Sequence, residues 1–176
     1  TASANYNGSE TFTVSITDSQ LTDSQDITVT VLAVNDAPVA TVSLSGTTAE
    51  DQSVVISLSG SDVDGDNLTF SLNTNATNGS ISIDGSIATY TPDANYNGAD
   101  SFSFTVSDGE LDDTATVTLT IDPINDAPVL ATVSDVSFDE DGSDSISLSG
   151  SDVDGDDLSY SIIGGSDITA TLDGND

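Results

Sequence analysis

Four short motifs occur twice in this chain, and the second copy of each lies 90 residues after the first. The repeated pairs are Ala-Asn-Tyr-Asn-Gly at 4–8 and 94–98, Asn-Asp-Ala-Pro-Val at 35–39 and 125–129, Glu-Asp at 50–51 and 140–141, and Leu-Ser-Gly at 58–60 and 148–150. Because one spacing holds for all four pairs without an insertion, the chain is built from tandem copies of one module. Whatever fold the sequence adopts must therefore close within about 90 residues.

The Asn-Asp-Ala-Pro segments mark the predicted module boundaries. Proline removes a backbone hydrogen-bond donor and drives the preceding residue toward extended conformations, so we expect these segments to be linkers. The chain then holds the C-terminal part of one repeat (1–36), a complete repeat (37–126) and the N-terminal part of a further repeat (127–176).

Apolar and polar residues alternate within each module. In the complete copy, Phe102, Phe104 and Val106 form one such series, and Val117 and Leu119 belong to another. A period of two predicts strands with one buried face, and no segment has a sustained helical period. About seven short strands in about 90 residues is the number expected for an immunoglobulin-like Greek-key β-sandwich. The predicted fold class is all-β, with one sandwich per repeat.

The charge of the chain excludes several functions. Its 176 residues include 31 Asp and Glu but no Lys, Arg, His or Cys, which gives a formal net charge of −31. Phosphate recognition depends on Lys and Arg, so nucleic acid is excluded as a partner, and no apolar run is long enough for membrane insertion. Nucleophilic mechanisms that need His, Lys or Cys are excluded as well. Paired carboxylates could in principle hydrolyse glycosides, but the same acids in every module favour a structural role, and we expect no enzymatic activity.

One acidic motif, Ser-Asp-Val-Asp-Gly-Asp, occurs at 61–66 and again at 151–156. No side chain of this protein can neutralise it, so a cation from solution is the expected partner. Calcium prefers about six to eight oxygen ligands in flexible geometry, which Asp and Asn supply, whereas the lack of Cys and His disfavours zinc. The EF-hand pattern fails, because Gly65 and Asn73 stand where that loop requires other residues. Asp-Gly also makes plain turns, which is the favoured interpretation of Asp84-Gly85, and the two interpretations are about equally balanced for Asp66.

Two motifs together resemble the bacterial cadherin-like tandem repeats, including the VCBS type, of large surface adhesins. The segment Asp-Val-Asp-Gly-Asp-Asn-Leu-Thr-Phe-Ser at 62–71 resembles the cadherin Asp-x-Asp motif and the strand after it. The segment from Tyr90 to Gly109 resembles the late signature of the bacterial repeat. The resemblance implies a cadherin-like β-sandwich and calcium ions between successive domains.

Carried over residue by residue, the resemblance implies two groups of calcium ligands. The first junction would use Asn35, Asp36, Asp62, Asp64 and Asp108, and the second would use Glu50, Asp93, Asn95, Asn125, Asp126, Asp152 and Asp154. Asp66 is added to the first group as a candidate from the acidic loop itself. Ser3 stands where the next copy has Asp93, so the first junction has one carboxylate fewer. The resemblance then implies one or two ions per junction, with weaker binding at the first.

The expected function is that of a calcium-rigidified spacer, or extender, in a large secreted or cell-surface bacterial adhesin-like protein. Its expected partners are the neighbouring repeats of the same chain, together with a polysaccharide or cell-surface ligand if loops bind one. Two alternatives are a polysaccharide-binding or homophilic adhesion module, and an accessory domain of a secreted polysaccharide-degrading enzyme. Sparse aromatic residues, 5% of the chain, argue against a sugar-binding platform. Tyr6 and Tyr96, at equivalent positions, are expected to be core or corner residues.

Overall fold

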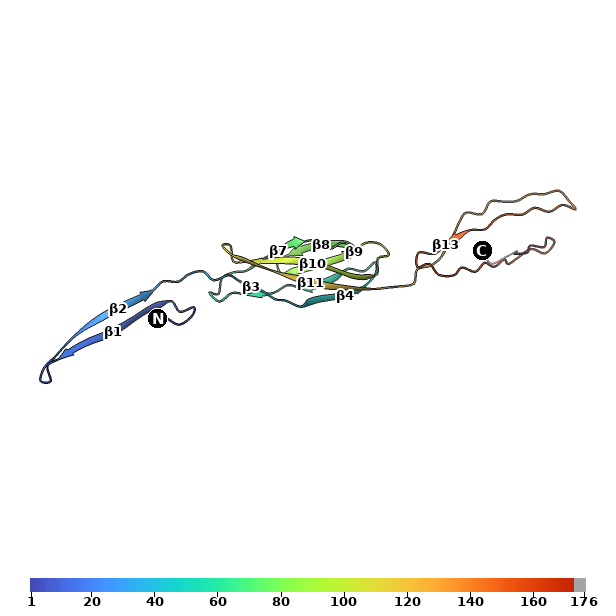
Figure 1. Ribbon diagram of the computed structural model, residues 1–176. Coiled ribbons are helices and arrows are strands. Elements are labelled where there is room, and N and C mark those ends of the chain that lie inside the picture. Colours follow the sequence, from blue (N-terminus) through green and yellow to red (C-terminus); the bar gives the residue numbers. More distant parts are fainter. Residues whose placement is uncertain (173–176) are drawn as a thin grey trace. The chain divides into compact units, whose positions relative to one another are not determined.

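The computed structural model describes residues 1–172, and this range contains strands but no helix (Figure 1). This range therefore offers no helix that could cross a membrane. The chain divides into two compact units, the first ending at Asp122 and the second beginning at Pro123.

The first unit contains a complete β-sandwich of nine strands. They are β3 (Val39–Ala40), β4 (Leu44–Ala49), β5 (Val54–Ser57), β6 (Gly60–Ser61), β7 (Thr69–Thr74), β8 (Gly79–Asp84), β9 (Ile87–Pro92), β10 (Gly98–Ser107) and β11 (Asp112–Asp122). A four-stranded sheet has the order β4-β11-β10-β7, a three-stranded sheet has the order β5-β9-β8, and β3 pairs with β6. Seven of the nine strands have four residues or more, so the predicted immunoglobulin-like sandwich is confirmed.

The core lies between these sheets and follows the alternation of the sequence. Phe102, Phe104 and Val106 of β10 and Val117 and Leu119 of β11 are all buried, while the residues between them are more exposed. Successive side chains of a strand point to opposite faces, so one face of each strand supplies the core. Each such side chain contributes about 1.5–3 kcal/mol on burial.

One polar network is built into this core. Tyr90 of β9 is fully buried, and its hydroxyl donates to the Asn78 carbonyl and to Asp100 Oδ2, both at 3.1 Å. Asp100 also accepts the backbone N–H groups of Asn78 and Thr77 at 2.9 and 3.1 Å. Burial alone would raise the pKa of Asp100, but these hydrogen bonds, with that from Ser101 N–H, hold it below its ordinary value. The network ties the turn before β8 to β9, which lies in the same sheet as β8, and to β10 of the other sheet.

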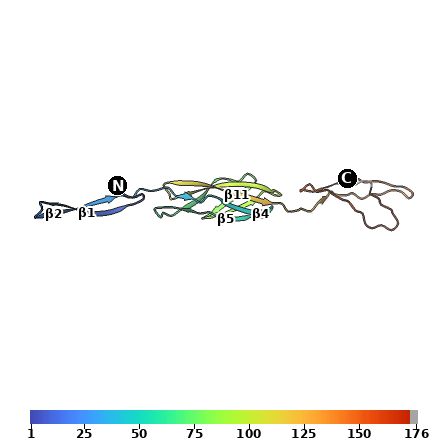
Figure 2. The same cartoon turned by 60° about the horizontal axis from the view of Figure 1, so that its bottom comes forward.

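One pairing in the sandwich is parallel. β4 pairs with β11, and both strands are labelled in Figure 2. Leu44 lies opposite Val117 and Ala49 opposite Asp122, whereas every other pairing in the sandwich is antiparallel. The Glu50 N–H continues this ladder by donating to the Asp122 carbonyl at 2.9 Å. The chain thus enters the four-stranded sheet at β4 and leaves it at β11 in the same direction.

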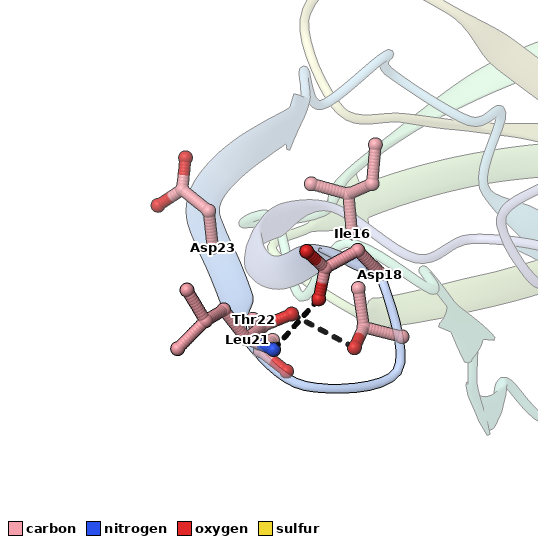
Figure 3. A pocket seen from close by; sticks show the side chains of 6 residues that line it. Ile16, Asp18, Leu21, Thr22 and Asp23 are labelled. Atoms are coloured by element: carbon pink, nitrogen blue, oxygen red, sulfur yellow. Dashed lines mark hydrogen bonds between the residues drawn. The ribbon is translucent and has the colours of Figure 1, made fainter.

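The first unit also contains a hairpin of β1 (Gly8–Thr17) and β2 (Thr22–Val31). Its register, from Gly8 opposite Val31 to Thr17 opposite Thr22, repeats that of β10 and β11 at an offset of 90. Figure 3 shows the turn, where Asp18 Oδ1 accepts the Leu21 N–H at 2.8 Å and the Thr17 hydroxyl donates to the Leu21 carbonyl at 2.9 Å. The hairpin therefore has the local structure of the last two strands of a repeat.

The described part of the second unit, residues 123–172, has one pair of short strands. β12 (Val129–Leu130) pairs with β13 (Gly150–Ser151), as β3 pairs with β6 in the complete repeat. The stretches equivalent to β4, β5 and β7 form no strand here. In the complete repeat those strands pair with β9, β10 and β11, which have no counterpart within 123–172.

Candidate functional site

The acidic loop between β6 and β7 is organised around Asp62. Asp62 Oδ1 accepts the backbone N–H groups of Asp64 at 2.8 Å, of Gly65 at 3.1 Å and of Asp66 at 3.5 Å. Gly65 has φ of 82°, a conformation that favours glycine, and this lets the chain fold back over the Asp62 carboxylate. The loop therefore gathers the three acidic side chains instead of spreading them.

This arrangement leaves an acidic group without a positive partner. One carboxylate oxygen from each of Asp62, Asp64 and Asp66 lies within 4.8 Å of the others. Asp62 Oδ2 is buried and has no hydrogen-bond partner among the described residues. Burying a charged oxygen without a partner is unfavourable, so both the chemistry of the oxygens and their spacing fit a bound hard cation.

The linker before β3 is held against this loop. The Asp36 N–H donates to Asp64 Oδ2 at 2.8 Å, and the Asn35 side-chain amide donates to Asp108 Oδ2 at 2.9 Å. Backbone N–H groups of Leu111 and Glu110, followed by the Asn35 amide, lower the pKa of Asp108 and keep it ionised. Asn35 and Asp108 thus form one directly bonded group, and Asp36, Asp62, Asp64 and Asp66 form a second.

The second unit repeats the loop and its linker. Asp152 Oδ1 accepts the N–H groups of Asp154 at 2.9 Å and Asp156 at 3.4 Å, and the Asp126 N–H donates to Asp154 Oδ2 at 2.7 Å. The Asn125 amide donates to the Asp126 carbonyl at 3.0 Å. The contact between linker and loop is therefore a property of the module and recurs at an offset of 90.

The remaining three predicted ligands belong to the first unit. Glu50, at the end of β4, is 3% exposed and is the one buried acidic residue of the described range. Asp93 and Asn95 lie on the exposed turn between β9 and β10, where Asp51 Oδ1 accepts the Asn95 N–H at 3.0 Å. It stays a prediction that Glu50, Asp93 and Asn95 share ions with the second linker.

Two acids with structural roles were missed by sequence reasoning. Asp100 holds the buried tyrosine, and Asp113 Oδ2 accepts the Ala40 N–H at 2.9 Å, which fixes β3 against the start of β11. A signal for Asp100 was present, because it falls in the inward phase of β10 together with Phe102 and Phe104. A carboxylate at an inward position indicates a buried hydrogen-bond network. Tyr96 meets its prediction: it packs against the core, and its hydroxyl donates to the Ala99 carbonyl at 2.7 Å.

Comparisons with known proteins gave one family-model match and several structural similarities with TM-scores below 0.5. Residues 35–120 match the family model of the bacterial Ig domain. Among solved structures, Drosophila N-cadherin EC1-4 is 14% identical with a TM-score of 0.46, covering 72% of this chain and 36% of that chain. The endo-fucoidan hydrolase MfFcnA4 from glycoside hydrolase family 107 is 21% identical with a TM-score of 0.40, covering 67% of this chain and 19% of that one. The chain thus spans about a third or less of these two proteins. A search of curated proteins finds no match.

Proposed function

We propose that this chain is a calcium-rigidified spacer segment, of the cadherin or VCBS type, in a large secreted or cell-surface bacterial adhesin-like protein. The observation that carries the proposal is the buried Asp62 Oδ2, which has no hydrogen-bond partner among the described residues and lies in a group of three carboxylates. A chain without Lys, Arg or His cannot neutralise this oxygen itself. Calcium would be held by Asp62, Asp64 and Asp66, with linker residues Asn35 and Asp36 beside them.

The proposed mechanism follows from the position of the linker. The backbone of Asp36 is already hydrogen-bonded to Asp64, so an ion bound at this carboxylate would restrain the linker as well as the loop. Without an ion, like charges repel and the linker is free to hinge. With an ion, the acidic groups attract a shared charge and the angle between linker and sandwich becomes fixed. The equivalent contact between Asp126 and Asp154 supports the same role at the next linker.

Extracellular location is part of the proposal. Calcium modules of extracellular proteins typically have dissociation constants of about 10⁻⁴ to 10⁻³ M, which free calcium reaches outside cells and does not reach in the cytosol. The match of residues 35–120 to a bacterial Ig domain supports a non-catalytic role. The proposed partners are neighbouring repeats of the same chain.

Small-angle X-ray scattering of the chain during a calcium titration, followed by chelator, tests this function. We expect a longer maximum dimension and a narrower distribution of distances with calcium, reversed by chelator. The double variant Asp62→Asn/Asp152→Asn should lose the response, and Asp84→Asn/Asp112→Asn, with the same change in charge outside the loops, should keep it. Each sample is measured as it elutes from size exclusion, so that association cannot imitate extension. Scattering curves that do not change with calcium would rule out the spacer mechanism.

A further inference from the structure

The N-terminal segment of the complete repeat is attached to the sandwich by few contacts. Residues 35–42, which we call the strap, contain the end of the linker and the two-residue strand β3, which pairs with β6 in a two-stranded sheet. The next strand, β4, pairs with β11 over six residues. Among the apolar side chains of the strap, Pro38 and Ala40 are buried, whereas Val39 and Val42 are 60% and 70% exposed. The strap therefore contributes little to the core.

Three carboxylates bind the strap. Two of them, Asp64 and Asp108, bind the end of the linker. The third, Asp113 on β11, accepts the Ala40 N–H with Oδ2 at 2.9 Å. Hydrogen bonds from the N–H groups of Ala40 and Thr114 lower the pKa of Asp113, so the acceptor is a charged carboxylate. Because hydrogen bonds to a charged acceptor are stronger than those to a neutral one, Asp113 attaches β3 firmly to the four-stranded sheet.

Ser43, directly after the strap, is a strained hinge. Its φ is 64°, in the left-handed region that residues other than glycine rarely adopt. The chain changes its partner here, because β3 before Ser43 pairs with β6 and β4 after it pairs with β11. Such a conformation persists only where the surrounding structure holds it. Release of the strap would let Ser43 return to a favoured conformation while β4 stays in its sheet, so the strain favours release.

The attachment of the strap is a feature of the module. β12 pairs with β13 as β3 pairs with β6, and the Ala131 N–H donates to the Ser149 carbonyl at 2.8 Å, as its counterpart does in the complete repeat. The carboxylate has a counterpart in the other direction, since Asp23 of the hairpin stands 90 residues before Asp113. Both the strap and the acid that holds it thus belong to the repeating pattern of the chain.

We propose that the strap is a releasable segment, which leaves the complete repeat as one unit while both sheets stay folded, and that Asp113 is the positioning residue that holds it. Release adds up to roughly 26 Å of extended chain to the linker, from eight residues at about 3.3 Å each. Local opening of this kind occurs where few apolar contacts hold a segment. Because the Asp36 N–H is attached to Asp64, an occupied acidic loop would keep the strap closed, and this step alone rests on the proposed function.

Amide hydrogen exchange of the intact chain in chelator, followed by NMR, tests the proposal. Asp36, Ala40 and Thr41 report on the strap, because the N–H of each donates a hydrogen bond. Phe104 and Val117, fully buried on the two central strands of the larger sheet, report on the sandwich. We expect the strap amides to exchange on the order of a hundredfold faster than the sheet amides. Low concentrations of urea should accelerate the sheet amides alone, because release of the strap exposes little surface.

Equal exchange rates and equal urea dependence for the two sets of amides would overturn the proposal. That result would mean that the strap leaves the sandwich only when the whole domain unfolds.

Substitutions at Asp113 test its role. Asp113→Ala removes the carboxylate that holds β3, so it should accelerate all three strap amides about tenfold and leave the sheet amides unchanged. Asp113→Asn keeps an acceptor oxygen and should restore most of the protection. Asp112→Ala, which removes the neighbouring exposed acid, is the matched control and should exchange like the wild type. The proposal is wrong if Ala40 alone responds, because the strap is then not one unit, or if the sheet amides respond equally.

A disulfide between β3 and β6 provides a second test, since the chain has no cysteine of its own. Val39 lies opposite Ser61, and opposite residues of an antiparallel pair have Cα atoms about 4.5–5.5 Å apart, within the range of a disulfide. Oxidised Val39→Cys/Ser61→Cys should slow the strap amides by more than about tenfold, with the sheet amides unchanged, and reduction should reverse this. If oxidation does not slow the strap amides, they exchange without release of the strap, and the proposal fails.

Calcium separates this inference from the proposed function. If the function holds, millimolar calcium should slow the strap amides, and Asp62→Asn should abolish the response. Suppose that the strap opens in chelator but neither exchange nor scattering responds to calcium. The strap then stands and the spacer function is rejected. A scattering response to calcium, without separate opening of the strap in chelator, would reject the strap and support the spacer function.

Discussion

Replacing Asp62 by Asn should have opposite effects on stability with and without calcium. Asn keeps an oxygen that can accept the three backbone N–H groups now bound by Asp62 Oδ1, so the loop can retain its fold. What changes is the charge of the three-carboxylate group. The substitution removes one of three mutually repelling charges and, at the same time, one ligand of the proposed ion.

The magnitude without calcium follows from the spacing of the oxygens. Two unit charges 4.8 Å apart in water repel by about 0.9 kcal/mol, and Asp62 faces two such partners. Screening at 0.1 M salt reduces the sum to about 1 kcal/mol. In chelator, Asp62→Asn should therefore be more stable than the wild type by up to about 1 kcal/mol, which is about 4–8 °C in the melting temperature of a domain this size.

The magnitude with calcium follows from linkage. At 10 mM calcium, a site with a dissociation constant of about 10⁻⁴ to 10⁻³ M stabilises the folded wild type by about 1.4–2.7 kcal/mol. Asp62→Asn should lose most of this gain, so its melting temperature should fall below that of the wild type. Calcium thus reverses which of the two proteins has the higher melting temperature.

Thermal melts followed by circular dichroism, in chelator and in 10 mM calcium, measure both effects on the same samples. Asp84→Asn is the matched control, because it removes one acidic charge at the turn between β8 and β9, outside the loop. It should respond to calcium like the wild type. The reasoning is refuted if Asp62→Asn melts below the wild type in chelator, or if it keeps the full calcium response.

Three further predictions concern the buried network and the turn beside it. Tyr90→Phe leaves the Asn78 carbonyl and Asp100 Oδ2 without the hydroxyl donor, and urea unfolding should show a loss of about 1–3 kcal/mol; no loss would mean that water replaces the hydroxyl. Gly79→Ala would place a Cβ 2.5 Å from both the Thr91 carbonyl and the Tyr90 ring, so it should lower the free energy of unfolding by about 1–3 kcal/mol or more in the same assay, and an unchanged urea midpoint would contradict this. The pKa of Asp100 is lowered in the folded state, so its contribution to stability is present above the unfolded pKa of about 4 and is lost as the pH falls through the folded value. Between pH 7 and pH 3, the urea midpoint should therefore fall more in the wild type than in Asp100→Asn. Equal falls in the two proteins would exclude this role for Asp100.

The strands could be predicted from sequence because alternation is a short-range pattern, whereas the grouping of the linker with the acidic loop was expected from the family resemblance. Alternation in Phe102, Phe104 and Val106 places one face inward whatever the partner strand is. The offset of 90 relates Asp36 to Asp126 and Asp64 to Asp154, so one argument covered both loops. In the structure Asp36 contacts Asp64, and Asp126 contacts Asp154; neither contact involves an ion.

Long-range pairing could not be predicted in the same way. Nothing in the local pattern of Leu44–Ala49 indicates that this strand runs parallel to β11, because its partner lies about 70 residues further along the chain. The role of Asp100 was hidden for a related reason. Its hydrogen bonds come from Thr77, Asn78 and Tyr90, and only the folded topology brings these groups to β10.

The parallel pairing of β4 with β11 has a mechanical consequence. A pull on the two ends of the complete repeat draws Leu44 and Asp122 in opposite directions along the strands, so the two strands must slide past each other. All six residue pairs of this ladder then carry the load together. In an antiparallel hairpin pulled apart at its open end, the hydrogen bonds would break one after another at a much lower force. The domain should therefore resist a force along the chain far better than a force that peels its strands apart. A tether under tension requires resistance to a force along the chain.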